Sequence, residues 1–261
     1  MKDRILAIIQ QEYFITKRSL EVIFDLFIFS TITIVVFSFV AKYLAGSANP
    51  SGALYLIIGL LLWEIVRIGQ YSITVSVLWN VWSRNLSNMF VSPMSTTEYL
   101  LALMISSFGK CIVVIAMLAF FVYWITGFNL LSLGFTNLIL YFINLIVFSW
   151  SVGILITGVI FKYGTRIQAM SWGVIFLFQP LSASFFPISV LPQPLQVVAS
   201  YIPITHVFTA ARNSINNPTV DWGLFLYSLF LNLIYFVVSC LLFVYFYRKS
   251  LQTGQFARNE G

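Results

Sequence analysis

Four ionisable side chains lie within apolar stretches of the sequence and are the first candidates for chemistry. Glu64 and Arg67 are three residues apart, so on a helix they share a face and can form an ion pair. Lys110 lies deep in another apolar stretch, whereas Asp25 is near the edge of its own and is interpreted as a boundary residue. A charge at the centre of a bilayer costs at least about 2.5–3.5 kcal/mol. Glu64, Arg67 and Lys110 therefore indicate either a polar pathway or buried pairs that orient neighbouring helices.

Metal, redox and nucleophilic chemistry have little support in the sequence. His206 is the only histidine, which excludes paired-histidine metal sites and argues against a Ser-His-Asp triad. Cys111 and Cys240 lie inside apolar runs, without the spacing of a metal site or a disulfide framework. The phosphate-binding pattern Gly-x-x-x-x-Gly-Lys-Ser/Thr does not occur. We expect no metal and no cofactor on this chain.

The composition is typical of an integral membrane protein. Sixty per cent of the residues are hydrophobic, the mean hydropathy is +0.93 and only 8% are charged, whereas soluble domains carry about 25% charged residues. The net charge of +6 does not indicate nucleic acid, because the basic residues are scattered at the edges of apolar runs. We expect an all-α integral membrane fold whose surroundings are the lipid bilayer.

A membrane span needs about 20 mostly apolar residues, and five continuous stretches meet that length. They are 22–44, 53–78, 99–125, 136–161 and 223–247. A sixth, 168–185, is shorter and runs into a proline-rich segment. With the N-terminus inside, ten of the fourteen Lys and Arg residues fall on the cytoplasmic side. The positive-inside rule then predicts six spans in an inner (plasma) membrane, with both termini in the cytoplasm.

Residues 1–21 precede the first span and are expected to form an amphipathic helix at the cytoplasmic interface. Its apolar residues fall within an arc of about 160° at 100° per residue, with polar residues around the rest. These apolar residues are Ile5, Leu6, Ile8, Ile9 and Tyr13. Two interpretations stay open: a helix that anchors the chain in the interface, and a helix that packs against a cytoplasmic partner. Residues 22–261 would then form one transmembrane domain.

The longest polar interval between spans on the cytoplasmic side is 79–97. Apolar residues recur there at helical spacing and predict a short amphipathic helix that Pro93 ends. They are Trp79, Trp82, Leu86 and Phe90. Ser95 or Thr96 would cap the third span, with Glu98 in its first turn, where the helix dipole favours a carboxylate. In the fourth span, small residues recur every four positions and predict close helix packing: Ser149, Gly153 and Thr157.

Five of the eight prolines lie in the apolar stretch between Phe185 and Asp221. Proline removes a backbone donor and clashes with the preceding turn, so this stretch cannot be one helix. Within a bilayer, irregular backbone is tolerated only where protein or a water-filled path shelters it. We therefore expect two short re-entrant helices, 188–201 and 204–215, between spans five and six. They would lie in an outer segment, 186–218, that enters and leaves the membrane from the same side.

Two stretches of the sequence resemble one known family. SRNLSNMFVSPMSTTEYLLA is similar to the cytoplasmic coupling region of ABC-2 type exporter permeases, in which a polar helix is followed by a Ser-Pro-x-Ser-x-x-Glu pattern. FFPISVLPQPLQVVASYIPITHVFTAARN resembles the re-entrant helices of the same family. The outer pattern of the family is found here at Phe186, Pro187, Pro192, Pro203, Thr205, His206 and Arg212.

The resemblance implies a permease subunit in a dimeric export pathway for an amphiphilic or glycan-type substrate. A second copy of the permease would complete the pathway, and two ABC ATPase subunits, which bind ATP and Mg²⁺, would bind beneath. The resemblance assigns the seven residues of the outer pattern to an extracellular gate, although His206 as a simple polar cap stays open. It assigns the contact with the ATPase to Arg84, Asn85, Ser92, Pro93 and Glu98. For Arg84, a role in setting the topology stays open.

Two other classes of protein remain as alternatives. An ion-coupled carrier would use Asp25, Glu64 and Lys110 as a proton or ion relay. A membrane enzyme for lipid-linked substrates would gather Asp, Glu or His at a membrane interface, whereas the eight acidic residues here are dispersed. No motif in the sequence selects the transported substrate.

Overall fold

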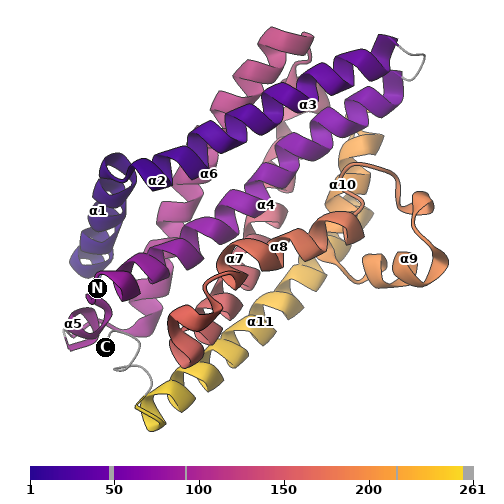
Figure 1. Cartoon of the computed structure of the whole chain (residues 1–261). Helices are drawn as coiled ribbons and strands as arrows, with labels where there is room; N and C mark the ends of the chain where they lie inside the picture. The colour runs from indigo at the N-terminus through magenta and orange to yellow at the C-terminus, as the bar shows by residue number, and fades with distance from the viewer. Residues whose placement is uncertain (47–49, 92, 216, 255–261) are drawn as a thin grey trace.

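The computed structural model describes residues 1–46, 50–91, 93–215 and 217–254 (Figure 1). Within these ranges every regular element is a helix. Five helical stretches are apolar and long enough to cross a membrane: Leu20–Gly46, Gly52–Trp82, Thr96–Thr126, Phe135–Ile167 and Trp222–Gln252. They confirm an all-helical, multi-pass membrane protein with the five long spans that the sequence predicts.

The first span contains a π-helical stretch, and a 3-10 turn ends the fourth. The first span consists of α2 (Leu20–Ile23), the π-helical stretch (Phe24–Ile28) and α3 (Phe29–Gly46). The other long helices are α4 (Pro50–Trp82), α6 (Thr96–Thr126), α7 (Phe135–Tyr163) and α11 (Trp222–Gln252). The shorter helices are α1 (Lys2–Arg18), α5 (Leu86–Val91), α8 (Met170–Leu181), α9 (Gln193–Ser200) and α10 (Pro203–Asn213). Short 3-10 turns occupy Leu130–Leu133, Gly164–Ile167 and Ile188–Val190.

The expected sixth span, 168–185, forms a shorter helix than predicted. Its helix α8 has 12 residues, or about 18 Å at 1.5 Å per residue, whereas the hydrocarbon core is about 30 Å thick. Pro180 lies in its last turn, and Ala183 just beyond it has a φ of 51°, which ends the helix. α8 alone is therefore too short to cross the bilayer, and the chain turns into the proline-rich segment.

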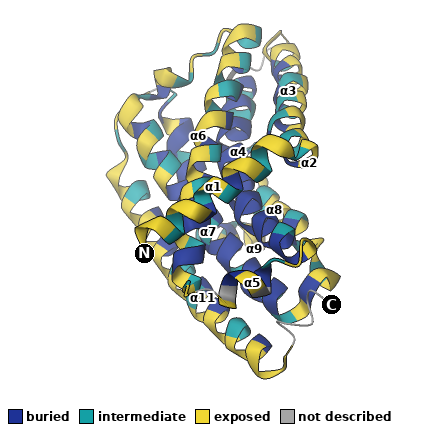
Figure 2. Cartoon of the chain, turned by 90° about the vertical axis from the view of Figure 1, so that its left-hand side faces the viewer, coloured by how far each residue is buried: buried dark blue, intermediate teal, exposed yellow. Residues whose placement is uncertain are grey.

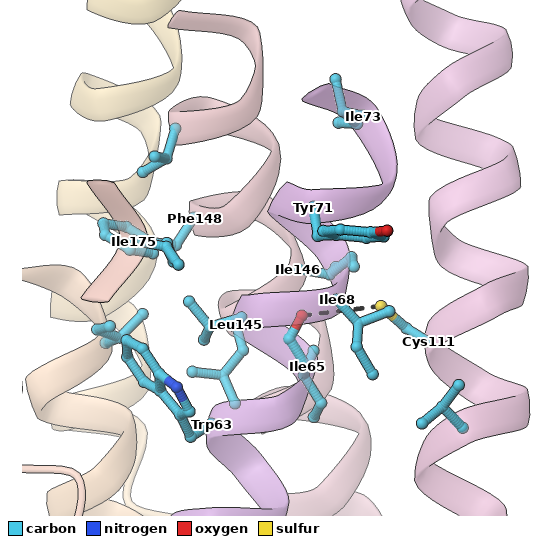
Figure 3. Packing of buried hydrophobic residues seen from close by; sticks show 14 of the residues in the cluster. Trp63, Ile65, Ile68, Tyr71, Ile73, Cys111, Leu145, Ile146, Phe148 and Ile175 are labelled. Carbon is cyan, nitrogen blue, oxygen red and sulfur yellow. Dashed lines mark hydrogen bonds between the residues drawn. The ribbon is translucent and has the colours of Figure 1, made fainter. Parts of the chain in front are cut away.

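α4 is the centre of the bundle. In its most apolar window 78% of the residues are buried, against 28% for Leu20–Gly46 and Thr96–Thr126 and 22% for Trp222–Gln252. The other helices therefore surround it, and most of its polar side chains are buried inside the bundle with its apolar ones. Figure 3 shows Trp63 on one side of α4 and Cys111 of α6 on the other, where the Cys111 Sγ lies 3.7 Å from the Ile65 carbonyl oxygen.

Small residues let α7 lie close to α4. A Cβ added to Gly69 of α4 would lie 2.5 Å from the Ser149 Oγ, and one added to Gly153 of α7 would lie 3.2 Å from the Ile73 Cβ. The predicted stripe of small residues on α7 thus faces α4 at Ser149 and Gly153. The close packing of α4 against α7 forms the centre of the molecule.

The two ends of the bundle carry different elements. The N-terminus, α5 and the last turn of α11 lie at one end, and the end of α3 and the start of α4 lie at the other (Figure 1). α9 and α10 lie toward that second end but stop short of it (Figure 1). They follow the expected order of two short helices around Pro203, although α9 begins only at Gln193 because a 3-10 turn and Pro192 precede it.

Candidate functional site

The end of α4 forms the first part of the predicted coupling region. The Arg84 N–H donates to the Val81 carbonyl at 3.0 Å and the Asn85 N–H to the Asn80 carbonyl at 2.9 Å, the bonds of a Schellman ending. Arg84 takes the left-handed position, with a φ of 54°, which costs a residue other than glycine about 1–2 kcal/mol. This turn divides the helix expected before Pro93 into the end of α4 and the separate helix α5.

The predicted coupling residues next to this turn differ in exposure. The Arg84 side chain is exposed, and Asn85 is half-buried, with its carbonyl accepting from the Met89 N–H at 3.0 Å in α5. Pro93 is exposed, whereas Ser92 lies outside the described residues. Strained backbone tends to persist where it serves a function. An exposed arginine kept in a strained turn is therefore a candidate for contact with another protein.

Glu98 joins the start of α6 to α1. It forms a capping box with Ser95: the Glu98 N–H donates to the Ser95 Oγ at 3.2 Å, and the Ser95 N–H donates to the Glu98 Oε2 at 2.8 Å. Ser95 is therefore the cap, of the two residues expected. The Arg4 guanidinium lies 2.9 Å from the Glu98 Oε1. Glu98 is buried by these contacts, unlike Arg84 and Pro93.

Polar contacts join α1 to α4 and α6, and α1 lies across the surface of the bundle (Figure 2). Glu12 is 1% exposed, and its Oε2 accepts from the Lys110 Nζ at 2.9 Å and from the Ser76 Oγ at 2.5 Å. Gln11 donates to the Asn80 Oδ1 at 2.8 Å. The amphipathic helix expected at 1–21 is therefore packed against the helices of this chain itself.

Sequence reasoning missed the role of Glu12. This residue follows Ile8 by four positions and Ile9 by three, so it lies on the apolar side of α1. A carboxylate on such a face needs a buried partner, so the position of Glu12 on the apolar face could have predicted a buried ion pair. Lys110, expected among the pathway candidates, is that partner.

Glu64 and Arg67 form the ion pair that their spacing predicts. The Glu64 Oε2 lies 2.7 Å from the Arg67 Nη2 and 3.1 Å from the Arg67 Nε, and both side chains are buried. Arg67 also donates to the Ser30 Oγ of α3. Its guanidinium lies 5.7 Å from the centre of the Phe29 ring. The pair therefore links α4 to α3 in the middle of the bundle.

A cavity of about 190 Å³ lies beside this pair, between the first span, α4 and α8. Its polar lining residues are Asp25, Arg67, Gln70, Tyr71 and Ser171, and its apolar ones are Phe29, Trp172, Ile175 and Phe176. We call this cavity the cleft. Asp25 belongs to the π-helical stretch of the first span, a geometry frequent at functional sites, and it accepts from the Tyr71 hydroxyl at 2.7 Å.

The three residues of the relay interpretation have separate partners. Asp25 binds Tyr71, Glu64 binds Arg67, and Lys110 binds Glu12. Two of the three pathway candidates, Glu64 and Arg67, are thus together, and Arg67 lines the cleft.

Arg212 anchors the outer segment to the end of α8. It is 8% exposed, and its Nη1 donates to the carbonyl of Ala183 at 2.7 Å. Ala183 is the left-handed residue that ends α8, so this bond fixes the turn into the outer segment. The same turn lies against α4, because a Cβ on Gly59 would lie 2.0 Å from the Ser184 carbonyl oxygen. Only glycine fits at position 59 without a shift of the backbone.

His206 closes the turn between α9 and α10. Its Nε2 lies 2.8 Å from the Ser200 carbonyl oxygen, and its ring meets the Tyr227 ring edge-on with 4.8 Å between centres. Pro203 begins α10, and its carbonyl accepts from the Ser228 Oγ at 2.9 Å. Of the other residues in the outer pattern, Thr205 is buried, Phe186 is half-buried, and Pro187 and Pro192 are exposed.

A comparison with protein families identifies the family of this chain. The family model for ABC-2 type transporters matches residues 3–216. The chain belongs to the ABC-2 type transporter family. Its match runs from α1 to α10 and so includes the turn at Arg84, the cleft and the outer segment as far as residue 216. No curated protein sequence matches this ABC-2 chain.

An ABC-2 domain is a membrane permease domain without an ATPase, so ATP is hydrolysed on a partner subunit. Within the described part of the chain, no group of three or more His, Cys, Asp or Glu residues is placed to hold a metal.

Proposed function

We propose that two copies of this permease form the pathway of an ATP-driven exporter for an amphiphilic substrate, a glycan-bearing one included. The cleft carries this proposal, because four of its five polar side chains lie on Leu20–Gly46 and Gly52–Trp82, which are long and apolar enough to cross a membrane. In membrane proteins such groups face protein or a water-filled path and not lipid. A second copy placed across the cleft would supply both protein contact and a sheltered path.

The proposed orientation has the N-terminus, α5 and the end of α11 in the cytoplasm of a plasma membrane. α8, continued by the start of the outer segment, makes the remaining crossing, which is the fifth in chain order, and α9 and α10 follow it as the re-entrant helices of an extracellular gate. Support for this comes from the charge asymmetry of the sequence and from the position of α9 and α10, short of the end of α3 and the start of α4 (Figure 1).

A single cysteine tests this orientation. Val197 of α9 is 59% exposed, and we expect Val197→Cys to react with a membrane-impermeant thiol reagent added to intact cells. The variant is made with Cys240→Ser, while the buried Cys111 stays in place. Reaction only after the cells are permeabilised would place the outer segment inside and overturn the orientation.

The proposed contact with the two ABC ATPase subunits is the turn at Arg84 together with α5. Arg84→Gly tests it sharply, because glycine adopts a φ of 54° without strain and the variant therefore loses only the side chain. We expect the permease to insert normally and to retain at least about ten-fold less ATPase subunit on purification, as loss of one charged contact of about 1.4 kcal/mol would produce.

Arg166→Gly is the matched control for this experiment. Arg166 is exposed in the 3-10 turn after α7, so the variant removes the same charge away from the turn at Arg84. Its retention of the ATPase should equal that of the unmodified permease. Equal retention by Arg84→Gly as well would show that the arginine side chain makes no contact with the ATPase.

A further inference from the structure

We propose that the cleft binds an organic monocation, with its ammonium group held by oxygen acceptors and its apolar body against aromatic rings. The proposal rests on the export function above and names the chemical class of ligand at that pathway. It is carried by three independent features of the cleft: unpartnered oxygen atoms, a carboxylate whose partner is a hydroxyl, and ring faces without a cation.

Two oxygen atoms in the cleft have no hydrogen-bond partner among the described residues. They are the Gln70 Oε1 and the Ser171 Oγ, and both side chains are 0% exposed. The Gln70 amide nitrogen donates to the Thr74 Oγ1 at 2.9 Å and to the Ser171 carbonyl at 3.0 Å. Because a carbonyl only accepts, these bonds fix the orientation of the amide and leave its oxygen as the free atom. A buried acceptor without a donor is costly, and a ligand N–H would offset that cost.

The charges around the cleft favour a cation over an anion. Asp25 lines the cleft, Glu21 lies one helical turn before it, and Glu64 lies behind Arg67. Of these three carboxylates, only Asp25 lines the cleft. Arg67 already donates to both Glu64 oxygens and to Ser30. In the described part of the chain Asp25 therefore has a hydroxyl partner but no paired cation, and an ammonium group would balance its charge.

The rings of α8 suit the remainder of such a ligand. Trp172 and Phe176 are four residues apart on α8 and both line the cleft. The faces of aromatic rings attract cations, and Arg67 already lies against the third ring, that of Phe29. The volume of about 190 Å³ is below the ~300 Å³ of the smallest drug-sized pockets. The cleft therefore has room for an ammonium group with a body of one ring.

Three probes that share one ring and differ in charge test the proposal: benzylammonium, benzyl alcohol and benzoate. Their dissociation constants are measured by ligand-observed NMR on the full chain in nanodiscs at neutral pH. We expect benzylammonium to bind at least ten-fold more tightly than either of the others. We expect Asp25→Asn to weaken benzylammonium at least ten-fold, since that carboxylate is the counter-ion.

Asp3→Asn is the matched control, because it removes the same charge from an exposed position of α1 and should leave binding unchanged. Phe176→Leu is a second variant, at a side chain 44% exposed, and it should weaken benzylammonium several-fold without disturbing the fold. Equal binding of the three probes, tighter binding of benzoate, or an Asp25→Asn protein that binds as before would each overturn the ammonium site. If the ATPase still co-purifies in that case, the export function stands and only the ligand class is wrong.

Discussion

The ion pair between Glu12 and Lys110 allows a quantitative test of how α1 is held. The two side chains are 1% and 12% exposed and 2.9 Å apart. Lys110→Met keeps the length and apolar bulk of the side chain but leaves the Glu12 carboxylate buried, with the Ser76 hydroxyl as its remaining donor. Removing one partner of a buried pair costs about 3–5 kcal/mol, mostly because the other charge is left uncompensated. We expect the free energy of unfolding to fall by that amount.

A double-mutant cycle separates the pair from other effects of the substitution. Unfolding is followed in mixed micelles of increasing denaturing detergent for Lys110→Met, Glu12→Gln and the double variant. Because the double variant buries no charge at this site, it should recover about 2 kcal/mol or more relative to Lys110→Met. Lys162→Met is the control, since the Lys162 Nζ contacts the rings of Tyr163 and Phe246, which is worth about 1 kcal/mol or less. A Lys110→Met cost equal to that control, or a double variant no more stable than the single one, would refute the pair as the anchor of α1.

Two further predictions concern the contacts that hold the outer segment and the turn leading into it. In a thermal unfolding assay, Gly59→Ala should lower stability by about 1–3 kcal/mol, because the added Cβ would lie 2.0 Å from the Ser184 carbonyl oxygen. Gly46→Ala is the control. A Cβ at Gly46 meets no atom within 4 Å, so this variant should be close to neutral in the same assay. His206→Phe should keep the ring contact with Tyr227 but lose the Ser200 hydrogen bond, which is worth about 1 kcal/mol. A cysteine at Val197 should then react faster with the thiol reagent. An unchanged rate would mean that this bond does not hold the turn.

Local patterns allowed much of the fold to be predicted. Apolar length alone identified the five long spans, because a bilayer sets the length of a helix that crosses it. The spacing of Glu64 and Arg67 predicted their pair, since residues three apart on a helix are neighbours. The capping residue Ser95 was predicted as one of two candidates, because a short hydroxyl side chain before a helix binds its first free N–H groups.

Contacts between distant parts of the chain could not be predicted in this way. Glu12 and Lys110 are 98 residues apart, and only the packing of α1 on α6 brings them together. The lining of the cleft comes from three separate helices, and the free oxygen of Gln70 is defined by a bond to a carbonyl 101 residues away. The break at Arg84 has no local signal, because a left-handed helix ending is usually marked by glycine.

α4 joins the turn at Arg84 to the cleft as one continuous helix. It is a single helix of 33 residues that ends at Trp82, and Tyr71 in the cleft lies eleven residues earlier, about 17 Å away along the axis. Proline occurs in α4 only at its first residue, so nothing in the covalent chain favours a kink between the two places. A displacement at the Arg84 turn must therefore move Gln70 and Tyr71 as well. α1 is tied to the same length of α4 through Ser76 and Asn80, and it should move with α4 when the partner ATPase closes.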